Sequence, residues 1–329
     1  MRAVVVEELI GPDGAVLRDD VPEPEGAHPR ADGQRLLVDV HAASVSFPDL
    51  LQSRGEYQIA TPPPFVSGGE FAGVVVEAPA GSGFVAGDRV AGMSIWGALG
   101  ERALALPTYT LKLPDTVDYA EGAALFLNSA TAWFAIDRAG VRAGETVLVH
   151  GAAGGVGTAA LEMLKAMGAR SIAVVSSDEK ERVARELGAD AVVRSTGDWL
   201  ADVRELTDGH GVEVVLDPVG GDRFTDSLRA LDVAGRLVVI GFAGGGIPEV
   251  KVNRLLLRNL TVTGIGLDPM ERRFPGTVAR VRDAVVDLAA RGVIRPRIGT
   301  RLPLERGADA LRVLERRAAI GNVVVDVRT

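Results

Sequence analysis

Cysteine is absent from the 329 residues of this chain, which excludes disulfides, thiolate catalysis and cysteine-ligated metal sites together. The histidines at positions 28, 41, 150 and 210 show no i, i+4 pair or other ligand spacing, so the sequence predicts no metal site. The chain also lacks an apolar run of about 18 residues and an apolar segment of the signal-peptide kind near its start. We therefore expect a cytoplasmic protein without a membrane partner.

Basic residues are fewer than acidic ones, with 36 Lys and Arg against 44 Asp and Glu and a net charge of −8. Lysine occurs only at positions 112, 165, 180 and 251, and aromatic residues make up 5% of the chain. A nucleic-acid binder needs a basic stripe, often interleaved with aromatic side chains, and none is present. We therefore expect no nucleic-acid partner.

The segment from Glu145 to Gly168 is the most informative part of the sequence. An apolar strand runs into a glycine-rich turn that reads Ala152-x-Gly154-x-x-Gly157, and the turn opens an amphipathic helix. Glycines let the backbone approach a pyrophosphate closely, and the helix N-terminus offers N–H groups to its charge. The alternative is an ordinary strand–turn–helix that binds nothing. The pattern predicts nucleotide binding by Ala153, Gly154, Gly155, Val156 and Gly157.

Strands and helices alternate from about residue 145 to residue 266. The periodicity predicts strands at 146–150, 171–175, 190–193, 213–217, 236–240 and 260–265, and helices at 156–167, 178–187, 198–206, 222–231 and 252–258. Continuous apolar strands such as 212–217 are typical of a parallel sheet that is covered on both faces. We interpret this part as a doubly wound nucleotide-binding domain.

The first 120 residues differ, because they are rich in Pro and Gly and contain short alternating strands such as 35–41 and 73–77. That composition predicts an all-β barrel or sandwich with long loops. After about residue 270 we expect helices at 273–291 and 305–317 and a last strand at 322–327, which return to the first domain.

Motifs of one family occur in order along nearly the whole chain. They lie at 43–49, 54–57, 64–73, 86–90, 128–132, 150–157, 187–190, 235–242 and 321–324. In them the chain resembles the zinc-free quinone oxidoreductase branch of the medium-chain dehydrogenases/reductases, the group that includes zeta-crystallin. The resemblance implies an α/β protein whose doubly wound parallel-sheet (Rossmann) cofactor domain is inserted in a GroES-like β-barrel catalytic domain. We expect residues 1–122 and 268–329 to form the catalytic domain and 123–267 the NADP-binding domain.

The zinc-binding relatives carry Gly-His-Glu where this chain has Gly68-Gly69-Glu70. We interpret Glu70 as a leftover carboxylate or a buried partner for an arginine. Without a metal to stabilise an alkoxide, hydride transfer suits an acceptor that is already electron-poor, such as a quinone or an enone. Its product anion is delocalised, so the enzyme contributes mainly by holding the nicotinamide against the acceptor.

Two residues are candidates for contact with the acceptor. Tyr57 matches the family's Gly-x-Tyr, and the resemblance implies a hydroxyl donor, as in the related enoyl-thioester reductases, or a pocket wall; the alternative is a packed aromatic. Ser46 stands where the family usually has an asparagine that contacts cofactor or substrate. Asp49 is interpreted as a helix cap or a salt-bridge partner.

The end of the second strand of the nucleotide-binding domain bears on the choice of cofactor. NAD-specific sites place an Asp or Glu there, whereas this strand ends in Ser176 and Ser177, with Lys180 nearby. Hydroxyl donors and a point charge suit a 2′-phosphate, so the sequence favours NADPH over NADH. Asp178 is interpreted as a first-turn carboxylate of the next helix, and Arg194 as added positive charge toward the phosphate.

The remaining cofactor contacts follow from the resemblance. It implies that Asn128 and Thr131 lie near the nicotinamide, with helix capping as the alternative, that Phe242 and Ala243 lie in the loop that touches this ring, and that Arg317 lies near the cofactor. Family members commonly dimerise along the strand at 260–265. An apolar sheet edge is a liability unless it is covered, so we expect a homodimer.

Three hypotheses of function follow. The first is an NADPH-dependent quinone reductase, and the second is an enoyl-thioester or enone reductase with Tyr57 as proton donor. The third is a protein that binds NADPH in a structural or RNA-binding role without catalysis.

Overall fold

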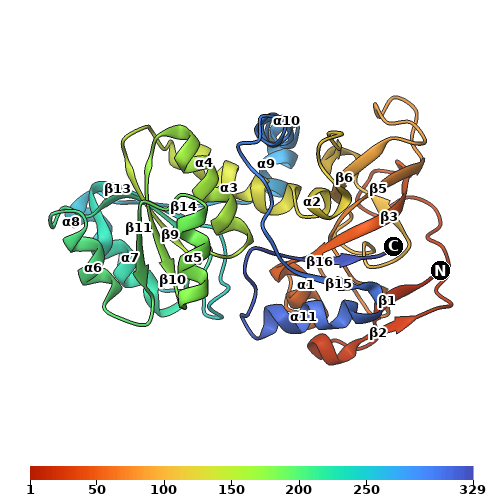
Figure 1. Cartoon of the computed structure of the whole chain (residues 1–329), viewed down its shortest axis with the longest axis horizontal. Coiled ribbons are helices and arrows are strands. Elements are labelled where there is room, and N and C mark those ends of the chain that lie inside the picture. The colour runs from red at the N-terminus through yellow and green to blue at the C-terminus, as the bar shows by residue number, and fades with distance from the viewer. Residues whose placement is uncertain (329) are drawn as a thin grey trace. The chain divides into compact units, whose positions relative to one another are not determined.

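The structure is a computed structural model, and it describes residues 1–328 (Figure 1). The chain forms two compact units, each of which is described by itself. The first consists of Met1–Leu127, Val278–Ala290 and the residues from Arg295 onward, and the second consists of Asn128–Thr277 and Arg291–Ile294. The first residue and the last described residue, Arg328, both lie in the first unit. The domain boundaries given above stay predictions.

The first unit is built on two sheets. A three-stranded antiparallel sheet has the order β2-β1-β4, formed by β1 (Ala3–Val6), β2 (Ala15–Arg18) and β4 (Phe65–Val66). The larger sheet has the order β15-β16-β3-β5-β6-β8, with β7 beside β3. Its strands are β3 (Leu36–Val45), β5 (Glu70–Glu77), β6 (Arg89–Met93), β7 (Arg102–Ala105), β8 (Thr110–Lys112), β15 (Ile298–Pro303) and β16 (Asn322–Asp326).

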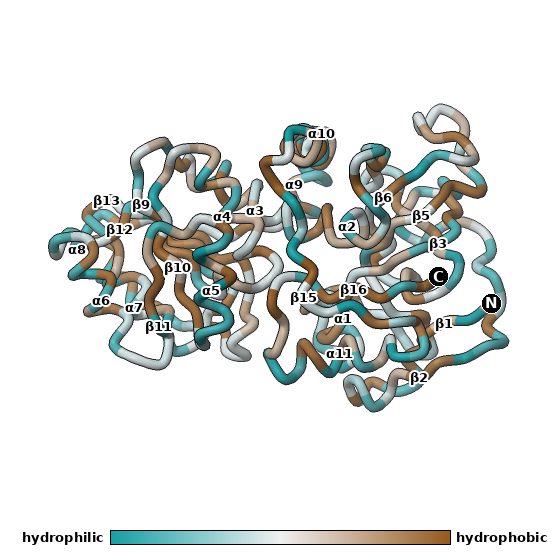
Figure 2. The backbone as a smooth tube through the Cα atoms, in the orientation of Figure 1, coloured by the Kyte–Doolittle hydropathy of each residue, from teal (hydrophilic) through white to brown (hydrophobic). Residues whose placement is uncertain are grey.

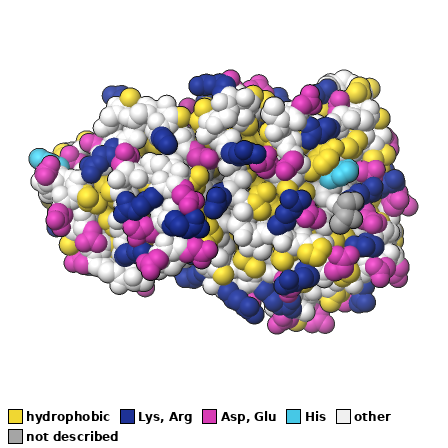
Figure 3. Space-filling view, in the orientation of Figure 1, with side chains coloured by type: hydrophobic (Ala, Val, Ile, Leu, Met, Phe, Trp, Pro, Cys, Tyr) yellow, Lys and Arg dark blue, Asp and Glu magenta, His cyan; other side chains and the backbone are white. Residues whose placement is uncertain are grey.

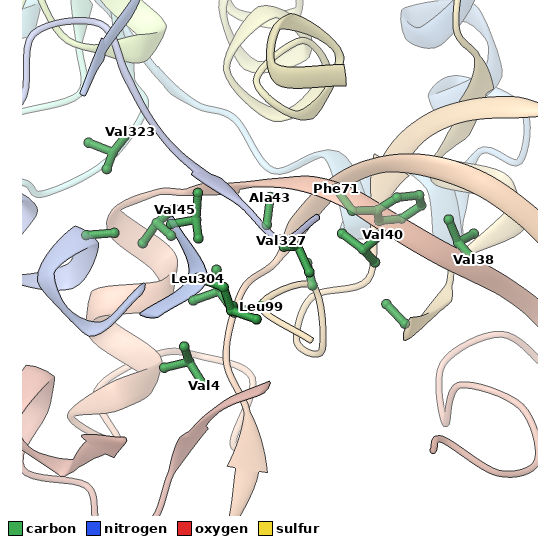
Figure 4. Packing of buried hydrophobic residues seen from close by; sticks show 14 of the residues in the cluster. Val4, Val38, Val40, Ala43, Val45, Phe71, Leu99, Leu304, Val323 and Val327 are labelled. Atoms are coloured by element: carbon green, nitrogen blue, oxygen red, sulfur yellow. The ribbon is translucent and has the colours of Figure 1, made fainter. Parts of the chain in front are cut away.

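Short helices complete the first unit. They are α1 (Phe47–Ser53), α2 (Tyr119–Ala123), α11 (Gly307–Glu315) and the 3-10 helices η1 (Gly11–Gly14), η2 (Pro107–Tyr109) and η4 (Leu304–Arg306), together with α10 (Thr277–Ala290). Its core lies around β3, which pairs antiparallel with β16, β5 and β7. Val38, Val40 and Phe71 are fully buried there and belong to one apolar cluster (Figure 4). Glu70 begins β5 and lies in register between Ser44 and Met93, so a carboxyl group is carried into a covered sheet.

The second unit contains one parallel sheet of six strands in the order β11-β10-β9-β12-β13-β14. The strands are β9 (Thr146–His150), β10 (Arg170–Val175), β11 (Ala191–Arg194), β12 (Val212–Asp217), β13 (Leu231–Val239) and β14 (Thr261–Gly264). The helices are α3 (Phe126–Ala139), whose first two residues belong to the first unit, α4 (Gly155–Met167), α5 (Asp178–Glu186), α6 (Trp199–Glu205), α7 (Phe224–Ala230), α8 (Asn253–Arg258) and α9 (Leu267–Arg273), with the 3-10 helix η3 (Gly221–Arg223). In Figure 2 the region around β10 is brown, whereas the charged helix α5 is largely teal. This is the doubly wound α/β fold expected from the sequence.

The helix expected at 273–291 is α10, and its start was expected four residues too early. The structure ends α9 at Arg273 and begins α10 at Thr277. Pro275 disfavours a helical conformation at Phe274, and Gly276 has a φ of +94°, outside the range of a helix. Similarly, the helix expected at 305–317 is a 3-10 turn followed by α11, which stops at Glu315.

Within residues 1–328, no helix combines the length and the apolar character that a membrane span requires. On the face drawn in Figure 3, Lys and Arg side chains lie among Asp and Glu side chains.

Candidate functional site

The glycine-rich turn after β9 is shaped by close backbone contacts. The N–H of Gly154 donates to the carbonyl of Gly151 at 2.9 Å, and Gly154 is the N-cap of α4. A Cβ at Gly157 would lie 2.6 Å from the Cα of Ala152, closer than carbon atoms pack. The absence of this side chain lets the start of α4 lie directly against the turn. A helix N-terminus held in this way at a strand end is the arrangement that binds pyrophosphate.

The sheet order places this turn where the chain changes direction. From β9 the chain adds β10 and β11 on one side, then returns to add β12 and β13 on the other. Because all these strands are parallel, their carboxyl ends lie at one edge of the sheet. Ligands of open α/β sheets bind at such a switch point, at the carboxyl ends of the strands. The cofactor residues predicted just after strands of the second unit therefore lie at this edge of the sheet.

Three predicted residues meet at the end of β10. Ser177 is the N-cap of α5, and its Oγ accepts a hydrogen bond from the N–H of Lys180 at 3.3 Å. The Nζ of Lys180 donates to the Oγ of Ser176 at 3.5 Å. Burial lowers the pKa of Lys180 from its usual value, while Glu179 opposes that change. The structure thus gathers Ser176, Ser177 and Lys180 into one polar group with hydroxyl and ammonium donors.

Arg194 ends β11, in register with Val175 of β10, and its guanidinium is held by carboxylates. Its Nη2 donates to Asp178 and, at 2.6 Å, to Glu181. Asp178 is therefore not only a first-turn carboxylate of α5. Its charge and that of Glu181 balance the guanidinium, so the phosphate contact assigned to Arg194 stays a prediction.

The loops after β12 and β13 are joined by hydrogen bonds. Asp217 ends β12 and accepts from the N–H groups of Val219 at 2.9 Å and Gly220 at 2.8 Å. The N–H of Ala243 donates to the carbonyl of Pro218 at 3.1 Å, which fixes the second loop beside the first. Phe242 is 37% exposed, and its ring lies 3.0 Å from where a Cβ on Gly220 would be. Phe242 and Ala243 are thus held at the carboxyl edge.

His150, at the end of β9, is packed inside the unit. Its Nε2 lies 2.8 Å from the Oγ of Ser227, and the hydroxyl of Ser227 donates to the carbonyl of Arg223 at 3.0 Å. Since Ser227 has one proton, it accepts from His150, which must carry its proton on Nε2. Burial lowers the pKa of His150 to about 4, with Asp217 opposing this and Arg223 adding to it. A neutral buried ring is structural here.

Asn128 and Thr131 are both half-buried on α3. The helix begins at Phe126, so Asn128 is its third residue and Thr131 lies in its second turn. Neither residue is the N-cap of α3, which argues against the alternative that they cap this helix. Their contacts to a nicotinamide stay predictions.

In the first unit, Ser46 and Asp49 flank the start of α1. Ser46 is the N-cap of α1, and the Oδ2 of Asp49, the third residue of the helix, accepts from the N–H of Ser46 at 2.6 Å, so Asp49 has the capping role expected from the sequence as part of a capping box. Ser46 is 7% exposed, and within residues 1–328 its Oγ and the Oδ1 of Asp49 are buried without a hydrogen-bond partner. Burial raises the pKa of Asp49 to about 7, while the N–H groups of Ser46 and Gly69 act to lower it.

Glu70 is the residue whose role the sequence did not reveal. Its Oε1 accepts from the backbone N–H of Leu127 at 2.6 Å, so its partner is a helix terminus and not an arginine. Burial raises the pKa of Glu70 to about 8; the N–H groups of Leu127 and Phe126 oppose this, and the nearby Asp49 carboxyl adds to it. The only indication of this role in the sequence was a carboxyl group at the start of an otherwise apolar strand.

Tyr57 and Arg317 complete the predicted set, and both belong to the first unit. Tyr57 lies half-buried in the bend after α1. Arg317 is exposed in the turn after α11, with a φ of +55° that is uncommon for a residue other than glycine. Their contacts to acceptor and cofactor stay predictions.

The metal-ligating residue types do not gather anywhere in the described part of the chain. Among residues 1–328 no group of three or more His, Asp or Glu side chains is placed to hold a metal ion. At the motif Gly68-Gly69-Glu70, the Oδ1 of Asp49 lies 3.1 Å from where a Cβ on Gly69 would be, so a larger residue would displace it.

Comparisons with known proteins agree with this architecture. Residues 32–115 match the alcohol dehydrogenase GroES-like domain, and residues 155–282 match the zinc-binding dehydrogenase family. Quinone oxidoreductase-like protein 2 of Rattus norvegicus is 36% identical over 331 residues, covering 99% of this chain and 92% of the relative.

Solved structures are similar over the whole length. A probable oxidoreductase from Mycobacterium abscessus is 40% identical with a TM-score of 0.89, covering 99% of both chains. The quinone oxidoreductase from Thermus thermophilus, solved also as its complex with NADPH, is 34% identical with a TM-score of 0.82, covering 99% of this chain and 100% of that one. The chain is therefore an oxidoreductase that belongs to the quinone oxidoreductase branch of the medium-chain dehydrogenase/reductase superfamily.

Proposed function

We propose that this protein is an NADPH-dependent quinone reductase that transfers hydride without a metal ion. The observation that carries the proposal is the polar group of Ser176, Ser177 and Lys180 at the end of β10, where an NADH site would have a carboxylate. Hydroxyl and ammonium donors suit a 2′-phosphate. The NADPH complex of the Thermus thermophilus relative and the names of the other relatives support the cofactor and the acceptor class.

The residues of the second unit fit this cofactor. In the turn, Gly154 and Gly157 have no side chain to cover the backbone N–H groups that would bind a pyrophosphate. Only glycine fits at position 157, because a Cβ there would collide with the Cα of Ala152. The loop with Phe242 and Ala243, and Asn128 and Thr131 of α3, would orient the nicotinamide ring and its carboxamide. When bound, NADPH would supply the hydride to an acceptor. The protein's own part is to hold the two reactants in line.

The donor set of the chain favours a quinone as acceptor. The chain has no cysteine and has Gly69 in place of a histidine, and residues 1–328 show no group of three or more His, Asp or Glu placed to hold a metal that would stabilise an alkoxide. A quinone needs no such help, because the charge that develops is delocalised over its ring. In the first unit we assign the hydroxyls of Ser46 and Tyr57 to the acceptor site, with Tyr57 lining it.

The test measures oxidation of the reduced nicotinamide by the change in its absorbance. The protein is treated with a chelator before the assay. NADPH and NADH are compared against benzoquinones, naphthoquinones, enones and crotonyl-CoA. We expect turnover of quinones with NADPH that the chelator leaves unchanged. Turnover only with the enoyl thioester would contradict the proposal and favour the enoyl reductase, whereas tight NADPH binding without any turnover would favour the non-enzymatic role.

The cofactor assignment has its own matched variants. Lys180→Ala removes one charged contact to the 2′-phosphate, so KM for NADPH should rise about tenfold while KM for NADH changes by less than about twofold. Lys165→Ala is the control, because Lys165 is an exposed lysine of α4. Equal effects of Lys180→Ala on the two cofactors would contradict the role of the polar group.

We also propose that the protein is a homodimer formed along β14. This strand ends the sheet of the second unit, and Leu256 and Leu257 of the preceding helix α8 are 78% and 76% exposed. An open edge beside exposed apolar side chains is stabilised when a second copy covers it. Elution at the monomer mass over a range of concentrations would contradict this. A cytoplasmic location stays a prediction of the sequence.

A further inference from the structure

Helix α3 begins without a capping side chain of its own. The residue before it is Leu125, which is fully buried and has no polar group, whereas Ser, Thr, Asp or Asn usually accepts from the first-turn N–H groups. Those N–H groups have no acceptor within the helix, and leaving them buried and unbonded is costly. The helix start therefore depends on an acceptor from elsewhere in the fold.

Glu70 supplies that acceptor from β5. Its Oε1 accepts from the N–H of Leu127 at 2.6 Å across 57 residues of sequence, and the whole residue is 1% exposed. The carboxyl end of this side chain also lies at the positive end of the α3 dipole, where acceptors are stabilised. The contact is buried, short and made by a residue fixed in the middle of a sheet between β3 and β6.

The other side of the Glu70 carboxyl group is restrained by its surroundings. Its Oε2 and the Oδ1 of Asp49 are both buried without a hydrogen-bond partner among the described residues. Asp49 is itself fixed by the N–H of Ser46 at the start of α1. The Glu70 side chain thus has one hydrogen-bond partner, the start of α3, and little freedom to leave it.

We propose that Glu70 is a positioning residue for the nicotinamide half of the cofactor: by capping α3 it fixes Asn128 and Thr131, which follow Leu127 in the first two turns of the same helix. The inference rests on the proposed function, because it takes Asn128 and Thr131 as contacts of the nicotinamide. Loss of the cap lets the first turn fray, which moves these side chains while the phosphate-binding turn after β9 keeps its own contacts.

Variants of Glu70 separate the length of the side chain from its charge. Glu70→Asp keeps the carboxyl group but shortens the side chain, so it no longer reaches Leu127. Glu70→Gln keeps the length and an acceptor oxygen but cannot ionise. Glu70→Ala removes the acceptor, and Glu77→Asp is the matched control, since the Glu77 side chain at the far end of β5 is 57% exposed.

Three quantities are measured for each variant: kcat with 1,4-benzoquinone, the Kd for NADPH by fluorescence titration, and the fluorescence enhancement of the bound nicotinamide. For Glu70→Asp and Glu70→Ala we expect kcat to fall about tenfold to a hundredfold, since a small misplacement of reacting groups has effects of that size. The enhancement should fall with it, while Kd changes less than about threefold. Glu70→Gln should retain most of the kcat and of the fluorescence enhancement of the unaltered protein.

The outcomes are distinct. If Glu70→Gln loses as much kcat and enhancement as Glu70→Asp, or if Kd rises in proportion to the loss of kcat, the positioning role is overturned. If Glu70→Ala does not fold, the comparison of the Asp and Gln variants decides. If the unaltered protein does not reduce quinones, the proposed function fails alone, and the inference is judged from the nicotinamide fluorescence and from hydrogen exchange of the first α3 amides. Those amides should lose protection in Glu70→Asp and keep it in Glu70→Gln.

Discussion

Replacing Glu70 by glutamine should change how the stability of the protein depends on pH. Burial raises the pKa of Glu70 from 4.5 to about 8 in the folded protein. An acid whose folded pKa is raised contributes its full stability below its unfolded pKa, near 4.5, and loses it as the pH rises through about 8. Stability of the unaltered protein should therefore decline across this window, and the decline should be smaller in Glu70→Gln.

The size of the effect follows from the two pKa values. Each pH unit between the unfolded and folded pKa changes the free energy of unfolding by about 1.4 kcal/mol, which gives on the order of 5 kcal/mol for Glu70 over the whole window. Asp49, whose pKa burial raises to about 7, titrates in the same window and remains in the variant. The slope should thus be reduced in Glu70→Gln and not abolished.

The assay is the melting temperature by differential scanning fluorimetry, from pH 5 to pH 9. The melting temperature of Glu70→Gln minus that of the unaltered protein should rise with pH by several degrees, since 1 kcal/mol is worth about 2–4 °C in proteins of 150–250 residues and less in a longer chain. Glu77→Gln is the control: its carboxylate is exposed and paired with Arg35, so its difference should stay flat. A difference for Glu70→Gln that is equally flat would refute the reasoning.

Three further predictions concern the other candidate residues. Gly157→Ala should raise the Kd for NADPH more than about tenfold in fluorescence titration, because a Cβ there would lie 2.6 Å from the Cα of Ala152 and push the helix start away; an unchanged Kd would contradict the pyrophosphate site. Tyr57→Phe should change kcat with quinones less than about threefold, whereas a loss of about a hundredfold would mean that Tyr57 donates the proton. Asp178→Asn should lower KM for NADPH about twofold to fivefold and leave KM for NADH unchanged, because it removes one of the two carboxylates that hold Arg194; the effect should shrink at high salt, and its persistence there would argue against an electrostatic cause.

The nucleotide-binding unit could be predicted from the sequence because its signals are local. The strand expected at 146–150 is β9, and the strand expected at 213–217 lies within β12, since continuous apolar runs between turn residues leave few alternatives. Ser176, Ser177 and Lys180 lie within one turn of chain, so their meeting at the end of β10 also followed from spacing.

The features that could not be predicted depend on contacts between distant residues. The pairing of Arg194 with Glu181 and Asp178 joins the end of β11 to helix α5, which only the fold brings together. Helix α9 was not expected from the sequence, and the helix expected at 273–291 began too early, before the local signal of Pro275 and Gly276. The capping of α3 by Glu70 had no local signal at the helix, because its start is apolar in sequence.

The Glu70 contact also bears on why two carboxyl groups are buried in the first unit. A buried carboxyl group destabilises the fold unless hydrogen bonds compensate, and each of this pair has one oxygen that is bonded to a helix start and one that is not. Asp49 caps α1, and Glu70 caps α3. If their only role were to stabilise helix starts, an exposed cap would serve at lower cost. What burial adds is rigidity, since a side chain without freedom to move holds a helix start in one place. That is the property needed where the same helix presents Asn128 and Thr131, and it predicts that the conservative amide at position 70 will preserve geometry while removing the cost of the charge.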